Sequence, residues 1–407
     1  MFIRRYDMVS LSRMRQILLL LAFLLSVQVH SMSWKIQPLE DLRRDVNAQV
    51  NEYIASFPQD ELGVSKAKAH LSNDANAADS RFWIKSSLEL SQDILRRHPL
   101  SPDNESIRKA AFLILDYPIH VNEKAKAEPE IKDLWEDIMM HYHGTAMTRA
   151  AESIRNTTVP AGKMAIWKIY NMGFVVKTAN HCVGFDLARP LLEHNRRLEL
   201  NRSMSPVLDQ IEVLFLSHIH GDHMQHWVCD YVATLGKPII APETWADQKN
   251  PTPHRNDSRF TYAWEDAIQP RTLSNGIQYR ALPGHQGKTR NSVFVVTLDG
   301  ITVMQTGDNT DATIATHFPA LGRVDILIVA CWARMLQTAK WLEAHCRADG
   351  KAPQFLISAH ENEVGHPPTN RESFQETYQR LGDRSKIIPS FVFDVGEGVL
   401  WPDGNAP

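Results

Sequence analysis

Cysteine is scarce in this chain, with four in 407 residues: Cys182, Cys229, Cys331 and Cys346. Three pairings of the four are possible if the protein is exported to an oxidising compartment. Cys331 ends a predicted buried strand, where a thiol behaves as a small apolar group. We expect unpaired core cysteines rather than disulfides. With 43% apolar residues, the chain can bury a sizeable core without such cross-links.

The sequence also lacks an excess of positive charge. It contains 44 Lys and Arg residues and 47 Asp and Glu residues, which leaves a formal net charge of −3. Such a balance provides no overall field that steers the chain toward a polyanion. We therefore expect a small-molecule substrate and no nucleic-acid partner.

The amino terminus lacks an apolar run long enough for a membrane span. Ile17 to Val27 is about 11 residues, against the roughly 20 that a spanning helix requires. Arginines precede this run, and Val29-His30-Ser31 offers a cleavage site. We predict a signal peptide over residues 1–31 and export to the periplasm or the medium, without stable membrane insertion after cleavage. An uncleaved anchor flanked by Trp34 and Lys35 is the alternative.

Apolar residues at three- and four-residue spacing predict a helical accessory region over residues 32–160. The periodic runs are Leu39 to Phe57, Phe82 to Leu95, Ile107 to Leu115, which stops before Pro118, and Ile131 to Met140, which extends toward Ile154. A polar stretch with proline and glycine at 156–162 predicts the domain boundary. The accessory region either covers the active site as a lid or serves as a dimerisation or stabilising layer.

Residues 161–407 are expected to form an α/β domain. Ala165 to Tyr170 and Phe174 to Thr178 predict a hairpin around residues 171–173. Strands then alternate with helices such as Thr338 to Arg347 and Arg371 to Leu381. This pattern is typical of two sheets covered by helices.

The densest group of metal-ligand residues is His218-Ile219-His220-Gly221-Asp222-His223, directly after the apolar run Ile211 to Leu216. We expect Gly221 to supply the turn that lets these side chains converge. Imidazoles and carboxylates without a thiolate favour a hydrolytic zinc-type site. A surface His-rich loop is the alternative. Three later apolar strands also end in a ligand residue, namely His285, Asp308 and His360, which favours a metal site.

Together these motifs resemble the metallo-β-lactamase superfamily, whose signature is His-x-His-x-Asp-His followed by a distant His, Asp and His. The resemblance implies a four-layer αββα sandwich over about residues 164–400. It implies that His218, His220 and His285 hold one metal, that Asp222, His223 and His360 hold a second, and that Asp308 bridges both. Asp186, at the end of Val183-Gly184-Phe185, resembles the family's aspartate that braces the metal loop.

The resemblance implies two zinc ions per chain, although manganese or iron would suit the same ligands. A hydroxide shared by two cations would attack the substrate bond, and Asp222 would act as general acid and base. The expected function is a dinuclear metal-dependent hydrolase of a small ester, lactone or phosphodiester.

The sequence departs from the motifs of individual branches of this superfamily, which narrows the choice of activity. β-Lactamases of this fold typically carry Cys or Ser where Asp308 stands, and diiron flavoprotein relatives usually carry Glu at the position of His220. The segments around Asp308, Val324 to Ala330 and His360 are most similar to the lactonase and phosphodiesterase-like branch. The alternatives are a β-lactam hydrolase and a non-catalytic binding protein that keeps metal only for folding.

Other residues are weaker site candidates. His366 and Trp332 are predicted to contact substrate, while Lys288, Arg290 and Arg334 would suit an anionic substrate group or be ordinary solvated charges. His141 and His143 are not expected to chelate one ion, because helical residues two apart face different directions. The sequence leaves the substrate, the native metal and the oligomeric state open.

Overall fold

The computed structural model describes residues 80–120, 129–244, 257–264, 267–332, 335–346, 353–366, 371–382 and 389–403. The predicted signal peptide, the periodic run from Leu39 to Phe57, and Arg334 lie outside the described residues. Within the described ranges, no helix has the length and apolar character that a membrane crossing requires.

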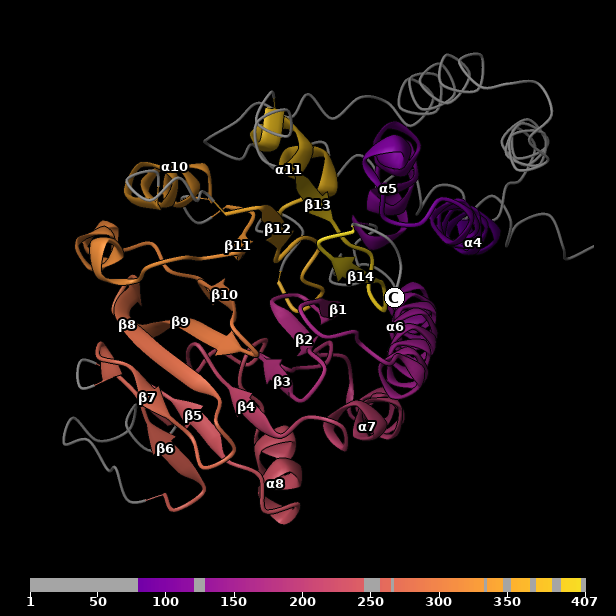
Figure 1. Cartoon of the computed structure of the whole chain (residues 1–407). Coiled ribbons are helices and arrows are strands. Elements are labelled where there is room, and N and C mark those ends of the chain that lie inside the picture. Colours follow the sequence, from indigo (N-terminus) through magenta and orange to yellow (C-terminus); the bar gives the residue numbers. More distant parts are fainter. Residues whose placement is uncertain are drawn as a thin grey trace, which may run out of the picture.

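Two sheets, each of seven strands in the described part of the chain, form the centre of the molecule (Figure 1). The first has the order β14 (Gly398–Trp401), β1 (Met164–Tyr170), β2 (Gly173–Lys177), β3 (Cys182–Phe185), β4 (Val213–Phe215), β5 (Ile239–Ala241), β6 (Phe260–Tyr262). The second has the order β13 (Ser390–Val392), β12 (Phe355–Ala359), β11 (Ile326–Ala330), β10 (Ile301–Gln305), β9 (Thr289–Leu298), β8 (Gln278–Gln286), β7 (Arg271–Thr272). Both are mixed: β3 to β6 and β10 to β13 run parallel, and the other neighbours are antiparallel.

Both faces of each sheet are buried. Successive strand residues point to opposite faces, so Ile166 joins the apolar core between the sheets while its neighbour Trp167 joins the core beneath the helices. Phe215 of the first sheet and Phe294 of the second meet between the sheets, with ring centroids 5.2 Å apart. This double burial explains why many strands are continuous apolar runs.

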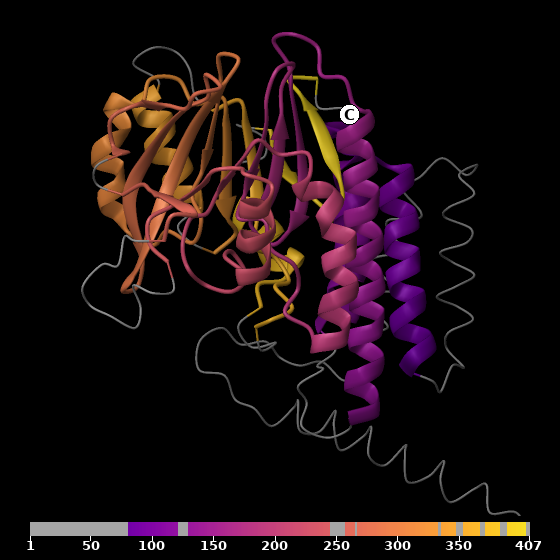
Figure 2. The same ribbon diagram turned by 90° about the horizontal axis from the view of Figure 1, so that it is seen from below.

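Helices cover the outer faces (Figures 1 and 2). On the side of the first sheet lie α6 (Pro129–Asn156), α7 (His194–Leu208) and α8 (His226–Thr234), and on the side of the second lie α10 (Met335–Cys346) and α11 (Phe374–Leu381). The other helices of the accessory region are α4 (Ser80–Arg97) and α5 (Glu105–His120), which pack against each other, while α5 also packs against α11. The short 3-10 helices η2 (Pro102–Asn104) and η4 (Ala312–Ala320) complete the order. The predicted αββα arrangement is confirmed.

Helix α5 differs from its predicted end. It continues through Pro118 to His120 instead of stopping before the proline. A proline in the last turn removes one amide donor, whereas Phe112 and Leu115 of the same helix are fully buried. Tertiary packing therefore outweighs the local signal.

The cysteines in the described residues match the expectation from the sequence. Cys182, Cys229 and Cys331 are free and buried. Burial raises the pKa of Cys182 and of Cys229 to about 12, so that both stay protonated at neutral pH. They act as core residues rather than nucleophiles.

Candidate metal centre

The predicted ligands lie where strands of both sheets end. Residues 218–223 follow β4 of the first sheet, and Asp308 and His360 follow β10 and β12 of the second. Because β10, β11 and β12 are parallel, their carboxyl ends share one edge. The strand order thus brings residues about 140 positions apart to one place.

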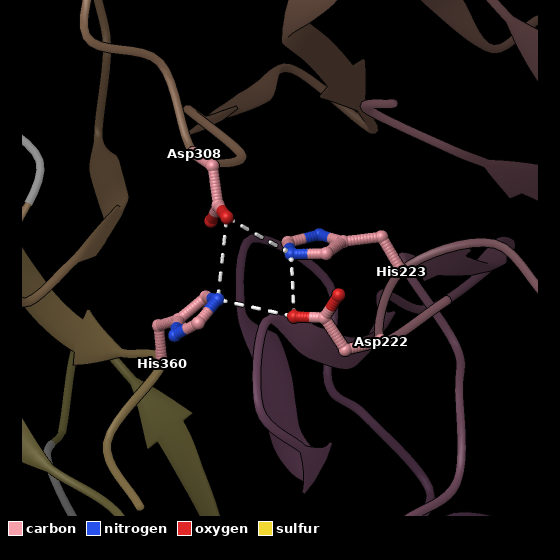
Figure 3. Close-up of side chains that lie close together, drawn as sticks. All are labelled: Asp222, His223, Asp308 and His360. Atoms are coloured by element: carbon pink, nitrogen blue, oxygen red, sulfur yellow. Dashed lines mark ion pairs between the residues drawn. The ribbon is translucent and has the colours of Figure 1, made fainter. Parts of the chain in front are cut away.

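Four of these side chains form the first compact group (Figure 3). His223 Nε2 lies 3.2 Å from Asp222 Oδ2 and 3.4 Å from Asp308 Oδ2. His360 Nε2 lies 3.2 Å and 3.3 Å from the same two oxygens. Ligand atoms at the corners of a tetrahedron with bonds of about 2.0–2.1 Å are about 3.3–3.4 Å apart, so this spacing fits one zinc-sized cation.

A second group lies beside the first. One ligand atom each of His218, His220 and Asp308 fall within 4.8 Å of one another. His218 Nε2 is 3.0 Å from His220 Nδ1 and 3.8 Å from Asp308 Oδ2. Asp308 therefore belongs to both groups, as a bridging carboxylate must.

His285 departs from the predicted ligand set, since neither group includes it. Its backbone lies close to the site, because its N–H donates to Asn309 Oδ1 at 3.0 Å and its carbonyl accepts from the Thr310 N–H at 2.8 Å. Its Nδ1 lies 3.0 Å from Asp311 Oδ2, and its ring packs edge-on against Trp264 with centroids 5.3 Å apart. These contacts hold the imidazole outside the described groups.

Asp186 contacts the start of the metal loop, as its predicted bracing role requires. It directly follows β3 and adopts a left-handed φ of 43°. Its Oδ1 accepts from the Ser217 N–H at 2.6 Å, and its Oδ2 accepts from Ser217 Oγ at 2.7 Å and from Gln305 Nε2 at 2.6 Å. The same Oδ2 lies 3.0 Å from His223 Nδ1, which leaves Nε2 to face the group.

Gly221 lies in a turn, as the sequence predicted. Its φ is not among the positive values in the described residues. Backbone bonds close the turn: the His223 and Met224 N–H groups donate to His220 O at 2.9 and 2.8 Å. Gln225 Nε2 also donates to Gly221 O at 2.8 Å.

Two amides contact the metal-facing carboxylates and were not predicted as site residues. Asn171, in the turn between β1 and β2, donates from Nδ2 to Asp222 Oδ2 at 2.8 Å. Gln286, next to His285, donates from Nε2 to Asp308 Oδ2 at 2.9 Å. The sequence offered only a turn signal at Asn171 and adjacency to a predicted ligand at Gln286.

Electrostatics in the site reflect two buried carboxylates among buried imidazoles. Burial opposes the charge on His360, but Asp308 and Asp222 outweigh it and raise its pKa to about 10. Burial likewise disfavours charge on Asp222 and Asp308, yet His223 and His360 hold both carboxyl pKa values well below their usual range. Burial lowers the pKa of His218 and His220, which keeps both neutral. Neutral imidazole and ionised carboxylate are the forms that bind metal, so a cation bound by His360 must displace the proton that its raised pKa favours.

The donor set fits a divalent cation. In the described residues, His223 Nε2, His360 Nε2 and Asp308 Oδ1 are buried without a hydrogen-bond partner, although both imidazole nitrogens lie within ion-pair distance of carboxylate oxygens. A buried polar atom that lacks a hydrogen bond is costly unless something else satisfies it. A cation bound to His223 Nε2 and His360 Nε2 would satisfy both imidazole nitrogens.

The predicted substrate residues lie beside His360. The His366 ring stacks on that of His360 with centroids 5.8 Å apart, and its side chain is 41% exposed. Trp332 packs edge-on against the same imidazole at 5.7 Å. Arg290 lies over Trp264 at 5.8 Å, and Lys288 is exposed at the β8–β9 turn.

His141 and His143 belong to neither group of possible ligands in the described residues. Both belong to α6, where His141 is exposed and His143 is buried. The His143 ring packs against Tyr142 and Tyr170.

No protein-family model and no curated protein matches the chain. Among solved structures, it is similar to Igni18, a metallo hydrolase from Ignicoccus hospitalis, with 14% identity, a TM-score of 0.41, and 59% of this chain and 98% of Igni18 covered. It is also similar to the metallo-β-lactamase fold protein YhfI from Bacillus subtilis, with 13% identity, a TM-score of 0.40, and 58% and 99% of the two chains covered. CmlA, a diiron β-hydroxylase from Streptomyces venezuelae, has 11% identity and a TM-score of 0.40, with 60% of this chain and 54% of CmlA covered. At these identities and TM-scores, the case for a metal centre rests on the ligand geometry.

Proposed function

We propose that this protein is a metal-dependent hydrolase with a two-metal centre. The observation that carries the proposal is the position of Asp308, whose Oδ2 lies within 3.8 Å of imidazole nitrogens from both ligand groups. A carboxylate between two sets of imidazoles, at spacings that suit metal bonds, is the arrangement of a dinuclear hydrolytic site. Bound there, two divalent cations supply activation of water and polarisation of the bond to be cleaved.

The chain's own residues hold and orient the reacting groups. His218 and His220 would hold one cation, Asp222, His223 and His360 the other, and Asp308 both. Asp222 is buried, and its Oδ2 faces His223 and His360. It is placed to hold or move a proton as general acid and base.

The proposed substrate is a small ester, lactone or phosphodiester, and the proposed metal is zinc. His366 and Trp332, beside His360, are the proposed substrate contacts, since His366 combines exposure with a polar ring. A set of ligands made only of nitrogen and oxygen atoms suits zinc and is also compatible with manganese or iron. Export, with cleavage of residues 1–31, belongs to the same proposal.

The test is hydrolysis by the purified protein, assayed with p-nitrophenyl esters, bis-p-nitrophenyl phosphate, lactones and nitrocefin, alongside metal analysis. We expect about two zinc ions per chain, hydrolysis of an ester, lactone or phosphodiester, and loss of turnover on chelation that added zinc restores. Asp222→Asn should lower kcat/KM by about 10²–10⁴-fold. His141→Ala, on the exposed face of α6, is the control and should keep full activity.

Three outcomes contradict the proposal in different ways. Turnover that survives metal removal rejects the metal mechanism. Zinc-dependent turnover of nitrocefin alone identifies a β-lactam hydrolase. Two bound zinc ions without turnover of any substrate identify a binding protein that keeps metal for its fold.

A further inference from the structure

The loop after β12, which carries His360, has an unfavourable backbone conformation. His360 has a φ of 73° and Asn362 a φ of 55°, both in the left-handed region. Side chains with a Cβ disfavour this region, so that such residues persist only where surrounding contacts hold them. The position of His360 therefore depends on what holds residues 360–362.

Contacts from the sheets hold the middle of the loop. Glu361, between the two left-handed residues, forms a buried ion pair with Lys168 of β1 at 2.7 Å. It also accepts from Ser358 Oγ at 2.5 Å. These bonds fix Glu361, whereas Asn362 is held by other contacts, the first of which is the bond from its N–H to Glu372 O at 2.8 Å.

An accessory helix holds Asn362. Asn362 Nδ2 donates to Asp116 Oδ1 of α5 at 2.8 Å, although the two residues are 246 positions apart. The same Oδ1 accepts from the Phe374 N–H, at the start of α11, at 2.8 Å. Asp116 thus joins the ligand loop to the positive end of a helix, where an anion is favoured.

A second contact ties the following residues to the same helix. Arg371 is buried, and its Nη1 donates to Ile119 O of α5 at 2.6 Å while Nε and Nη2 donate to the carbonyls of Glu363 and Val364. Its guanidinium also lies over the Trp135 ring of α6, 5.3 Å from the centroid. Two accessory helices therefore contact the segment that begins with a predicted metal ligand.

We propose that Asp116 is a positioning residue for the metal group of Asp222, His223, Asp308 and His360, and that the accessory helices are a structural part of the metal centre. Without Asp116, Asn362 loses its side-chain bond and keeps the backbone bond to Glu372 O, so its left-handed conformation is held less firmly and His360 moves away from Asp222 and Asp308. The group of His218, His220 and Asp308 takes no ligand from this loop and keeps its cation. The inference rests on the proposed two-metal function.

The test measures zinc binding by the full chain, using equilibrium dialysis with zinc alone and metal analysis. Asp116→Ala should lower the affinity for one of the two zinc ions by about 10–100-fold and leave the affinity for the other unchanged. Asp116→Asn should retain both, because an amide oxygen still accepts from Asn362 and Phe374. Asn362→Ala loses the side-chain bond to Asp116 but keeps a Cβ at the left-handed φ, so it should weaken binding of the same zinc ion. Combining it with Asp116→Ala should add little further loss.

Ser91→Ala is the matched control. Ser91 Oγ donates to Ala111 O at 2.7 Å between α4 and α5 and is buried, away from the ligand loop. It should lower the melting temperature while both zinc ions remain. Equal loss of zinc in Ser91→Ala and Asp116→Ala would mean that general destabilisation is the cause, and would overturn the proposal.

Failure of the inference is distinguishable from failure of the proposed function. If the wild-type chain binds no zinc, both fail. If the wild-type chain binds two and Asp116→Ala also binds two with unchanged affinity, only the role of Asp116 fails. If Asp116→Ala does not fold, Asn362→Ala decides: weaker binding of one zinc ion supports the proposal, and unchanged binding overturns it.

Discussion

The side chain and the backbone of Asn171 contact two predicted ligands that come from different sheets. Nδ2 donates to Asp222 Oδ2, while the carbonyl oxygen accepts from the His360 N–H at 3.4 Å. The residue is buried and has a φ of 50°, and its Oδ1 has no hydrogen-bond partner in the described structure. An amide in this position orients the Asp222 carboxylate toward His223 and His360.

Asn171→Gly isolates the contribution of this amide, because glycine adopts a left-handed φ at little cost. We expect kcat to fall by about tenfold with zinc content unchanged, since Asp222 keeps its place but loses the bond that orients it. Asn171→Ala should show the same loss and lower the free energy of unfolding by a further ~1–2 kcal/mol. Kinetics, metal analysis and urea unfolding measure these effects. Asn180→Ala, an exposed amide, is the control, and an equal loss of kcat there would contradict the role of Asn171.

At the scale of elements, the end of β10 shows why a ligand needs a particular residue before it. Gly307 precedes Asp308, has a φ of 52°, and a Cβ on it would lie 2.4 Å from Ser217 Cβ and 2.5 Å from Asn291 Oδ1. Ser217 is itself fixed by Asp186. The backbone of β10 thus approaches the metal loop more closely than any side chain at Gly307 would permit.

Gly307→Ala tests this close approach. We expect it to destabilise the protein by about 3 kcal/mol or more, from the left-handed conformation together with overpacking, and to weaken zinc binding as Asp308 shifts. Gly300→Ala is the matched control, because Gly300 has a φ of 81° but nothing within 4 Å of a Cβ. Gly300→Ala should lower the free energy of unfolding by only about 1–2 kcal/mol and leave zinc binding intact. Equal costs in urea unfolding would show that close approach is not the cause.

The sequence predicts where the strands end, and therefore which ligands gather, better than it predicts ring orientation. Apolar runs followed by His or Asp indicated the positions of His218 and Asp308, since a strand delivers its next residue to the sheet edge. The His285 imidazole is different, because Asp311, 26 residues away, determines where it points. Asn171 looked like an ordinary turn residue, because its contact with Asp222 exists only once the sheet has formed.

At the scale of the whole molecule, the accessory helices are bonded to the end of the chain. Tyr142 of α6 donates its hydroxyl to Asp394, just after β13, and Arg108 of α5 pairs with Glu397 at 2.6 Å. Amphipathic periodicity predicted that these segments are helical, but not which surface they cover. Their partners lie 252 and 289 residues later, beyond the reach of any local pattern.

Asp394 should make stability depend on pH. Burial, followed by the charge of Glu397, raises its pKa from 3.8 to about 6, although Tyr142, Arg149 and the Val395 N–H oppose the rise. Because the folded pKa exceeds the unfolded value, the stabilisation is fully present below about pH 3.8 and is lost as the pH rises through 6. As the pH rises from 4 to 7, the free energy of unfolding of Asp394→Asn should therefore increase by about 1–3 kcal/mol relative to that of the wild type.

Urea unfolding of both proteins across that pH range measures the difference. Glu199→Gln, whose side chain is exposed on α7, serves as the control and should follow the wild type. Parallel curves for Asp394→Asn and the wild type would exclude Asp394 as the titrating group.

The centre combines Asp222 and His223, which follow a strand of one sheet, with Asp308 and His360, which follow strands of the other, at the rim where these strands end. An ion bound among them would join the two layers directly, beside hydrogen bonds that already link them there, such as those from the Ser292 N–H to Ser217 O at 2.8 Å and from Gln305 Nε2 to Asp186 Oδ2 at 2.6 Å. Removal of the ion would leave these bonds and the packing to hold the layers together. Bound metal would therefore support both catalysis and the stability of that rim, and loss of the metal would weaken both.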